Sequence, residues 1–161
     1  MILQYFKKKE NKYKIKSNYI YLDILTKSKL LIEEKYFSEI NFSVTFELIS
    51  IFLIYYFKFL NDESVISNKR VKEELMKNLI NDLDKSLRDA GISDMSIGKY
   101  VKKYVKKFYY RLKVLDPIFE KNDNLQLVNY LNSLEFINKK YSNDLSIRLS
   151  EIFVVIKKNN Q

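Results

Sequence analysis

The scarcity of residues that interrupt helices constrains this sequence more than any other feature. Across 161 residues there are two glycines, Gly91 and Gly98, and one proline, Pro117. β-Sandwiches and barrels need frequent turns, and tight turns depend heavily on glycine and proline. Long helices need few such residues. We therefore predict an all-α fold, a single helical domain of about six helices, in a chain long enough to bury a sizeable core.

Hydrophobic periodicity places these helices along the chain. A leucine-rich stripe at a spacing of four runs from Val71 to Leu87 and predicts an amphipathic helix. Residues 43–60 are apolar nearly all round, which predicts a helix at the centre of the fold. Their most apolar part spans residues 48–57, whereas a membrane-spanning helix needs about 20 apolar residues. The remaining helices are expected over residues 17–31, 94–116, 125–137 and 144–156.

The first residues of the chain differ from the rest. Residues 1–16 are rich in lysine and only weakly periodic, which predicts a basic, flexible tail. Ser17 is suited to be the N-cap of the first helix. We therefore expect a tail over residues 1–16 and a helical domain over residues 17–161. The opening apolar run is short and precedes the charges, unlike a secretory signal.

Two missing residue types exclude much enzyme chemistry. The chain has no cysteine and no histidine. Disulfides, thiolate metal sites, histidine-containing zinc sites and Ser-His-Asp triads are therefore impossible. An enzyme is not excluded by this composition, but the usual catalytic groups are missing, and we expect no cofactor, no metal and no small-molecule substrate.

The charge is strongly and unevenly positive. The formal net charge is +9, which favours an anionic partner such as nucleic acid, the ribosome or an anionic membrane. Codon usage in an AT-rich genome can supply many lysines, but it does not explain their clustering. Residues 99–113 hold seven basic residues and no acid, whereas solvated helix faces usually mix both signs. This pattern predicts a basic surface, and it leaves RNA, lipid and protein open as partners.

A helix corner is expected just before this basic stretch. Gly91 is well placed to end the preceding helix in the left-handed conformation. Asp84 and Arg88 are four residues apart and can pair on the helix surface. Asp94 is suited to cap the next helix. We therefore assign Asp84 and Gly91 to a structural corner, which Arg88 and Asp94 help to shape.

The segment from Asp82 to Arg111 resembles the signature of the ubiquinol–cytochrome c chaperone family, in its α-proteobacterial form. Asp89 stands where that family has Glu, and Tyr110 stands where it has Gly. The helix near Leu48 also lacks the histidine that the family leads us to expect. The matching positions are Asp84, Leu87, Arg88, Gly91, Asp94, Phe108, Tyr109 and Arg111.

The resemblance implies a non-enzymatic assembly factor for respiratory complex III. Such a protein would bind newly made cytochrome b, in an apolar groove, and would lie in the cytoplasm, peripheral to the inner membrane. In mitochondrial relatives a small helper protein and the ribosome surface are further partners, and an anionic membrane surface is another expectation. The expected partner-binding residues are Arg88, Asp94, Lys99, Lys102, Lys103, Lys106, Tyr109 and Arg111. The alternatives are a basic helical protein that binds nucleic acid or the ribosome, and a peripheral membrane-binding protein.

Overall fold

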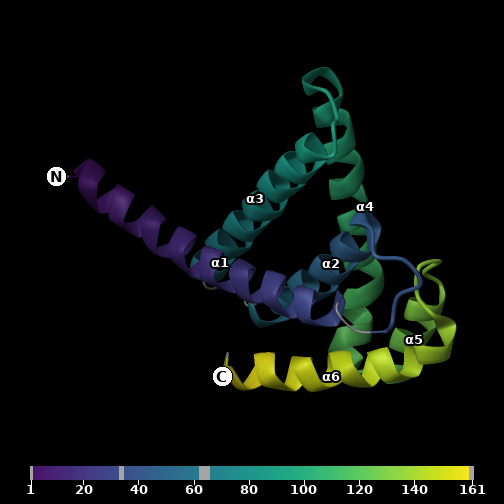
Figure 1. Ribbon diagram of the computed structural model, residues 1–161. Helices are drawn as coiled ribbons and strands as arrows, with labels where there is room; N and C mark the ends of the chain where they lie inside the picture. Colours follow the sequence, from purple (N-terminus) through teal and green to yellow (C-terminus); the bar gives the residue numbers. More distant parts are fainter. Residues whose placement is uncertain (1, 33–34, 62–65, 160–161) are drawn as a thin grey trace. The chain divides into compact units, whose positions relative to one another are not determined.

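The computed structural model describes residues 2–32, 35–61 and 66–159 (Figure 1). Within these ranges most residues are helical, and the only β-type pairing is an isolated bridge between Phe37 and Ile137. The all-α prediction is therefore confirmed. The helices are α1 (Ile2–Ile32), α2 (Phe42–Phe59), α3 (Ile66–Asp89), α4 (Asp94–Lys121), α5 (Asn124–Asn132) and α6 (Ser142–Asn159), with a 3₁₀ turn, η1 (Lys139–Tyr141), before α6.

The chain divides into two compact units. Unit 1 comprises Met1–Asp23 and Leu60–Tyr110, and unit 2 comprises Ile24–Phe59 and Arg111–Gln161. Both α1 and α4 therefore contribute residues to each unit.

The core of unit 1 is built on the predicted stripe of α3. The Tyr21 hydroxyl of α1 donates a hydrogen bond to Asp82 Oδ2 at 3.0 Å, and Asn78 donates to Asn18 at 3.0 Å. These bonds place α1 beside α3, with Tyr21 only 7% exposed. Burial of the apolar stripe is the main stabilising contribution, as its spacing predicts. The buried stripe residues are Val71, Leu75, Leu79, Leu83 and Leu87.

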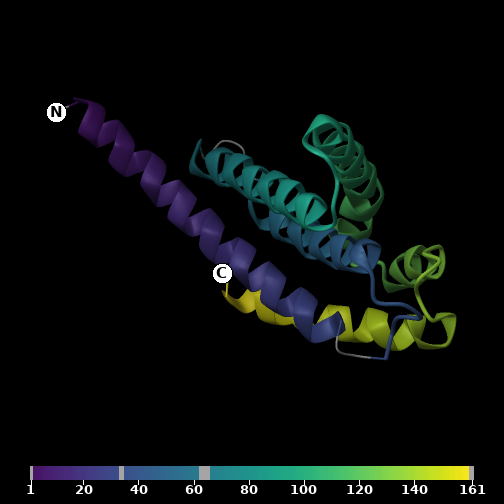
Figure 2. The same cartoon turned by 45° about the horizontal axis from the view of Figure 1, so that its top comes forward.

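The core of unit 2 is built on α2, whose residues from Phe46 to Phe57 are all buried. The Tyr55 ring stacks on Phe153 of α6 with centroids 3.9 Å apart, and both rings also meet Phe119 edge to face. This aromatic cluster fixes α2 against α6 and the end of α4. α5 packs against α6 as well (Figure 2).

The N-terminal part of α1 departs from the sequence-based expectation. α1 begins at Ile2, so residues 2–16 are helical, and Ser17 lies inside the helix rather than at its start. The Ser17 side chain is buried and donates to the Lys14 carbonyl at 2.9 Å. The prediction of an N-cap at Ser17 was therefore wrong, because a buried serine can satisfy its hydroxyl within the preceding turn. The flexibility of residues 1–16 stays a prediction.

α4 continues through Pro117, where the sequence led us to expect its end. Proline removes one helical hydrogen bond and crowds the preceding turn, at a cost of about 3 kcal/mol. Leu115, Ile118 and Phe119 are all buried, and their burial outweighs that cost. The helix ends instead at Lys121, and the next residue, Asn122, adopts a left-handed φ of 49°.

α5 is also shorter than predicted. It ends at Asn132 rather than near residue 137, and the chain then turns so that Ile137 pairs with Phe37. Ile137 is buried there, so it contributes to the core from outside a helix. An apolar residue at helical spacing can therefore lie in a turn, where contacts with distant parts of the chain bury it.

Candidate partner-binding surface

The corner between α3 and α4 is a Schellman motif centred on Gly91. Gly91 has a φ of +88°, the left-handed region that side chains other than glycine rarely adopt. The Ile92 N–H donates to the Leu87 carbonyl at 3.1 Å, and the Gly91 N–H donates to the Arg88 carbonyl at 2.8 Å. These two bonds satisfy carbonyls that the end of α3 would otherwise leave free. The predicted left-handed glycine is confirmed.

Arg88 bridges the two acids of the corner. Its guanidinium donates to Asp84 Oδ2 at 2.6 Å and also to Asp94 Oδ1. The hydrogen bonds to Asp84 and to Asp94 raise the pKa of Arg88. Asp94 is the first residue of α4, and the N-cap position before it belongs to Ser93, whose carbonyl accepts from Ile97 N–H at 3.0 Å. The expected Asp94 cap is thus replaced by an ion pair that ties the corner together.

The expected lysines form one exposed stripe on α4. Successive separations of three, one and three residues put them on the same side of a helix. No acidic residue lies between Met95 and Leu115, so this stripe carries one sign of charge. We call it the basic face of α4, and its residues are Lys99, Lys102, Lys103 and Lys106, all exposed.

Two tyrosines continue the basic face toward the end of unit 1. Tyr109 is 54% exposed and Tyr110 is 67% exposed, whereas the neighbouring Phe108 is fully buried. Tyr110 is four residues beyond Lys106 and therefore lies in line with the lysines. Tyr109 lies at the border of the stripe. The exposed rings could stack on a base or sit at a lipid interface.

Arg111 does not share this exposure. Its side chain is 17% exposed, and its Nε donates to Glu47 Oε2 of α2 at 2.6 Å. The Tyr130 hydroxyl of α5 donates to the other oxygen, Glu47 Oε1, and the guanidinium lies 5.5 Å from the centre of the Phe46 ring. Arg111 is therefore an internal tie of unit 2. This position explains why a chain rich in lysine has arginine here, since the planar guanidinium suits a buried carboxylate.

Glu47 is a functional residue that no pattern in the sequence singled out. It is 2% exposed and lies in a helix that is otherwise apolar over most of its length. A buried carboxylate requires a partner, because desolvation of an unpaired charge is costly. The signal that could have found it was this isolated acid in an apolar helix.

Unit 2 also contains a half-open pocket of about 470 Å³. Its apolar wall includes Tyr55, Phe119 and Phe153, and burial raises the pKa of Tyr55. Lys157 and Asp123 supply charge at the pocket. This volume lies within the range of binding sites for small ligands or for a few side chains of a partner.

Metal binding and membrane crossing were the remaining possibilities for the described residues. No group of three or more acidic, histidine or cysteine side chains is arranged to hold a metal ion within residues 2–32, 35–61 and 66–159. In the same ranges, α2 alone is long and apolar enough to cross a membrane, by length and composition. Because 72% of α2 is buried inside the structure, it has the character of a core helix.

Comparison with known proteins places this geometry in a family. The sequence profile of the ubiquinol-cytochrome C chaperone family matches residues 39–142, more than half of the chain. The chain belongs to the ubiquinol–cytochrome c chaperone family. The match includes the corner, the basic face of α4 and the Glu47–Arg111 pair, so the predicted resemblance is confirmed. Membership in this chaperone family indicates a non-catalytic assembly factor.

A solved structure supports the fold of this ubiquinol–cytochrome c chaperone. The crystal structure of the Cbp3 homolog from Brucella abortus matches with a TM-score of 0.60 and 23% sequence identity. The match covers 91% of this chain and 83% of that one. Among proteins with curated descriptions, none matches this sequence.

Proposed function

We propose that this chaperone binds newly made cytochrome b and escorts it into respiratory complex III. The observation that carries the proposal is the family match over residues 39–142. It includes the segment from Asp82 to Arg111, which carries the resemblance. Cytochrome b is a membrane subunit, so before assembly it must keep apolar surface away from water.

The pocket of unit 2 is the proposed contact for an apolar segment of cytochrome b. Its aromatic wall of Tyr55, Phe119 and Phe153 offers a large apolar area with a fixed geometry. At its rim Val154 is 53% exposed, so an incoming side chain would cover apolar surface that now faces water. Because Val154 of the lining is exposed to solvent, a side chain can enter the pocket from outside.

The basic face of α4 is the proposed contact for an anionic partner. Its four lysines produce a local positive field on a chain of net charge +9, and Tyr109 adds an exposed ring beside them. We propose that the protein acts in the cytoplasm, peripheral to the inner membrane, where newly made membrane subunits appear. A small helper protein and the ribosome surface are further proposed partners. Arg88 and Asp94 hold the corner from which α4 begins.

Deletion of the gene, followed by complementation, tests the proposal. We expect deletion to lower assembled complex III and the spectral signal of cytochrome b haem in membranes, while other respiratory complexes remain. Wild-type protein should restore both, and a Val154→Asp variant should restore them less well than Ile147→Asp. Ile147 is a matched control, because it is an exposed apolar residue of α6 outside the pocket lining. Normal complex III after deletion would contradict the proposal.

Nucleic-acid binding is a second candidate function, which the basic face of α4 favours. In this function the lysines would contact phosphates of ribosomal or other RNA, and binding would be independent of cytochrome b. The affinity should then fall steeply with salt, by about one power of the salt concentration for each phosphate contact. Substituting Lys102 and Lys103 by Gln should reduce that slope by about two. Salt-independent binding would exclude this function.

A further inference from the structure

The outer side of α1 in unit 1 exposes large apolar side chains. Ile15 is 63% exposed, Tyr19 is 78% exposed and Leu22 is 64% exposed. Their separations of four and three residues put them on one side of the helix. The opposite side of the same helix is packed, since Ile20 and Tyr21 are buried. The exposed stripe is therefore additional to the side that builds the core.

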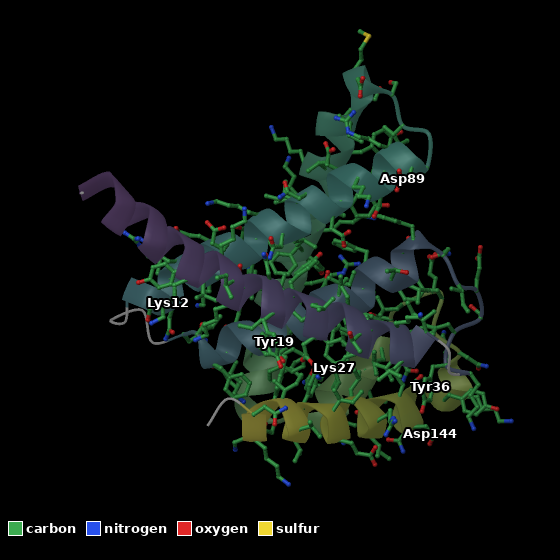
Figure 3. All side chains as sticks on the ribbon, turned by 60° about the vertical axis from the view of Figure 1, so that its left-hand side comes forward. Lys12, Tyr19, Lys27, Tyr36, Asp89 and Asp144 are labelled. Carbon is green, nitrogen blue, oxygen red and sulfur yellow. The ribbon has the colours of Figure 1, made fainter. Side chains whose placement is uncertain are left out.

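Lysines border this apolar stripe on both sides. At about 100° of rotation per residue, Lys14 and Lys16 lie to the two sides of Ile15. Lys12 lies three residues before Ile15, and all three lysines are exposed. Residues 12–22 contain no acid. Lys12 and Tyr19 can be followed along α1 in Figure 3.

We propose that this side of α1, which we call the outer face of α1, docks on an anionic lipid bilayer. Its residues are Lys12, Lys14, Ile15, Lys16, Tyr19 and Leu22. The helix lies in the plane of the interface, with its apolar residues in the boundary between headgroups and acyl chains. The lysines at its borders extend to lipid phosphates, and their stems cover apolar surface. Tyrosine is suited to the interface because its ring is apolar and its hydroxyl is polar.

The combination of charges and apolar residues selects lipid over the other occupants. RNA phosphates would pair with the lysines, but they offer nothing to the exposed side chains of Ile15 and Leu22. A second copy of the chain would cover the apolar stripe, but it would bring two sets of three lysines together, with Asp23 as the nearest acid that follows on each helix. An anionic bilayer supplies both the apolar layer and the negative charge.

The inference rests on the proposed function only for its cellular setting, because binding can be measured with lipid alone. Flotation of the full chain is compared on vesicles of phosphatidylcholine and on vesicles with about one third phosphatidylglycerol. We expect binding to the anionic vesicles, and at least about tenfold weaker binding to the neutral ones. The triple variant Ile15→Gln, Tyr19→Gln, Leu22→Gln should lose more than about tenfold in partitioning.

Two further variants separate the contributions. Replacing a lysine of the outer face by Gln should weaken partitioning about fivefold for each charge removed. A matched control replaces Ile40, Leu125 and Ile147 by Gln, which are exposed apolar residues outside α1 and outside the basic face of α4. This control should bind like wild type, and circular dichroism should show the same helicity for every variant, since all the altered side chains are exposed.

Three results would overturn the inference. These are equal binding by the outer-face triple variant and the control, equal binding to neutral and anionic vesicles, or concentration-dependent self-association that the triple variant abolishes. Loss of lipid binding with normal complex III assembly would leave the proposed function in place. If the purified chain binds lipid as expected but complex III is normal after gene deletion, the proposed function alone is contradicted.

Discussion

The Glu47–Arg111 pair leads to a sharp prediction about stability. Arg111→Leu removes the guanidinium that donates to Glu47 Oε2 at 2.6 Å. Glu47 is only 2% exposed in the structure, so its carboxylate would stay buried without this partner. Tyr130 then provides the one remaining hydrogen bond described for that carboxylate. Removing one partner of a buried ion pair costs about 3–5 kcal/mol, because an uncompensated charge stays in the interior. Since the Arg111 side chain is 17% exposed, we expect a value near the lower end, about 3 kcal/mol.

Urea unfolding followed by far-ultraviolet circular dichroism measures this loss. With a slope of about 2 kcal/mol per molar urea, the unfolding midpoint should fall by about 1.5 M. The double variant Glu47→Leu, Arg111→Leu should recover at least half of the loss, because apolar replacement of both charges is often neutral. Arg111→Lys should lie between wild type and Arg111→Leu, since lysine keeps the charge and loses the planar geometry.

A matched control comes from an exposed pair. Arg148 donates to Glu151 at 3.0 Å, and both side chains are about half exposed. Arg148→Leu should change the free energy of unfolding by less than about 1 kcal/mol. If Arg111→Leu costs no more than this control, or the double variant is as unstable as the sum of the single ones, the assignment of Arg111 as a buried tie is refuted.

Four further substitutions test single positions. Gly91→Ala should lower stability by about 1–2 kcal/mol in thermal unfolding, because alanine is strained at a φ of +88°. A Cβ at Gly91 would meet no atom within 4 Å, so the loss would come from the backbone alone. Gly98→Ala, inside α4, should raise stability by up to about 1 kcal/mol. Pro117→Ala should raise the free energy of unfolding by up to about 3 kcal/mol, because it restores a helical hydrogen bond in α4. No gain would contradict the cost assigned to this proline. Burial, followed by the charge of Asp82, raises the pKa of Tyr21. Below the unfolded-state pKa of about 10, the stabilisation from protonated Tyr21 is fully present. Above that pH only the unfolded state loses the proton, so the free energy of unfolding of wild type should fall by about 1.4 kcal/mol per pH unit relative to Tyr21→Phe. Parallel curves of stability against pH for the two proteins would contradict this.

Local signals in the sequence predicted much of the fold. The α3 stripe and the left-handed Gly91 depend on spacing and backbone conformation, which neighbouring residues determine. The path of α4 through Pro117 could not be predicted from neighbouring residues. Proline favours a helix end there, but the burial of Ile118 and Phe119 favours continuing the helix. The start of α1 before Ser17 was missed for a related reason, since a serine that satisfies its own hydroxyl need not be a cap.

The candidate site was only partly predictable for the same reason. The lysines of the basic face share one helix, so their common exposure follows from periodicity. The partner of Arg111 lies 64 residues away in the sequence, and charge alone could not distinguish a surface cation from an internal tie. The pocket joins α2, α4, α5 and α6, which no single stretch of sequence encodes.

Site-specific photocrosslinking in native membranes tests the central claim most directly. A photoreactive amino acid replaces Val154 at the pocket rim in one strain and Ile147 in another, both exposed on α6. After irradiation, the account predicts a covalent product with cytochrome b from position 154 and little or none from position 147. No cytochrome b product from position 154, or equal products from the two positions, would contradict it.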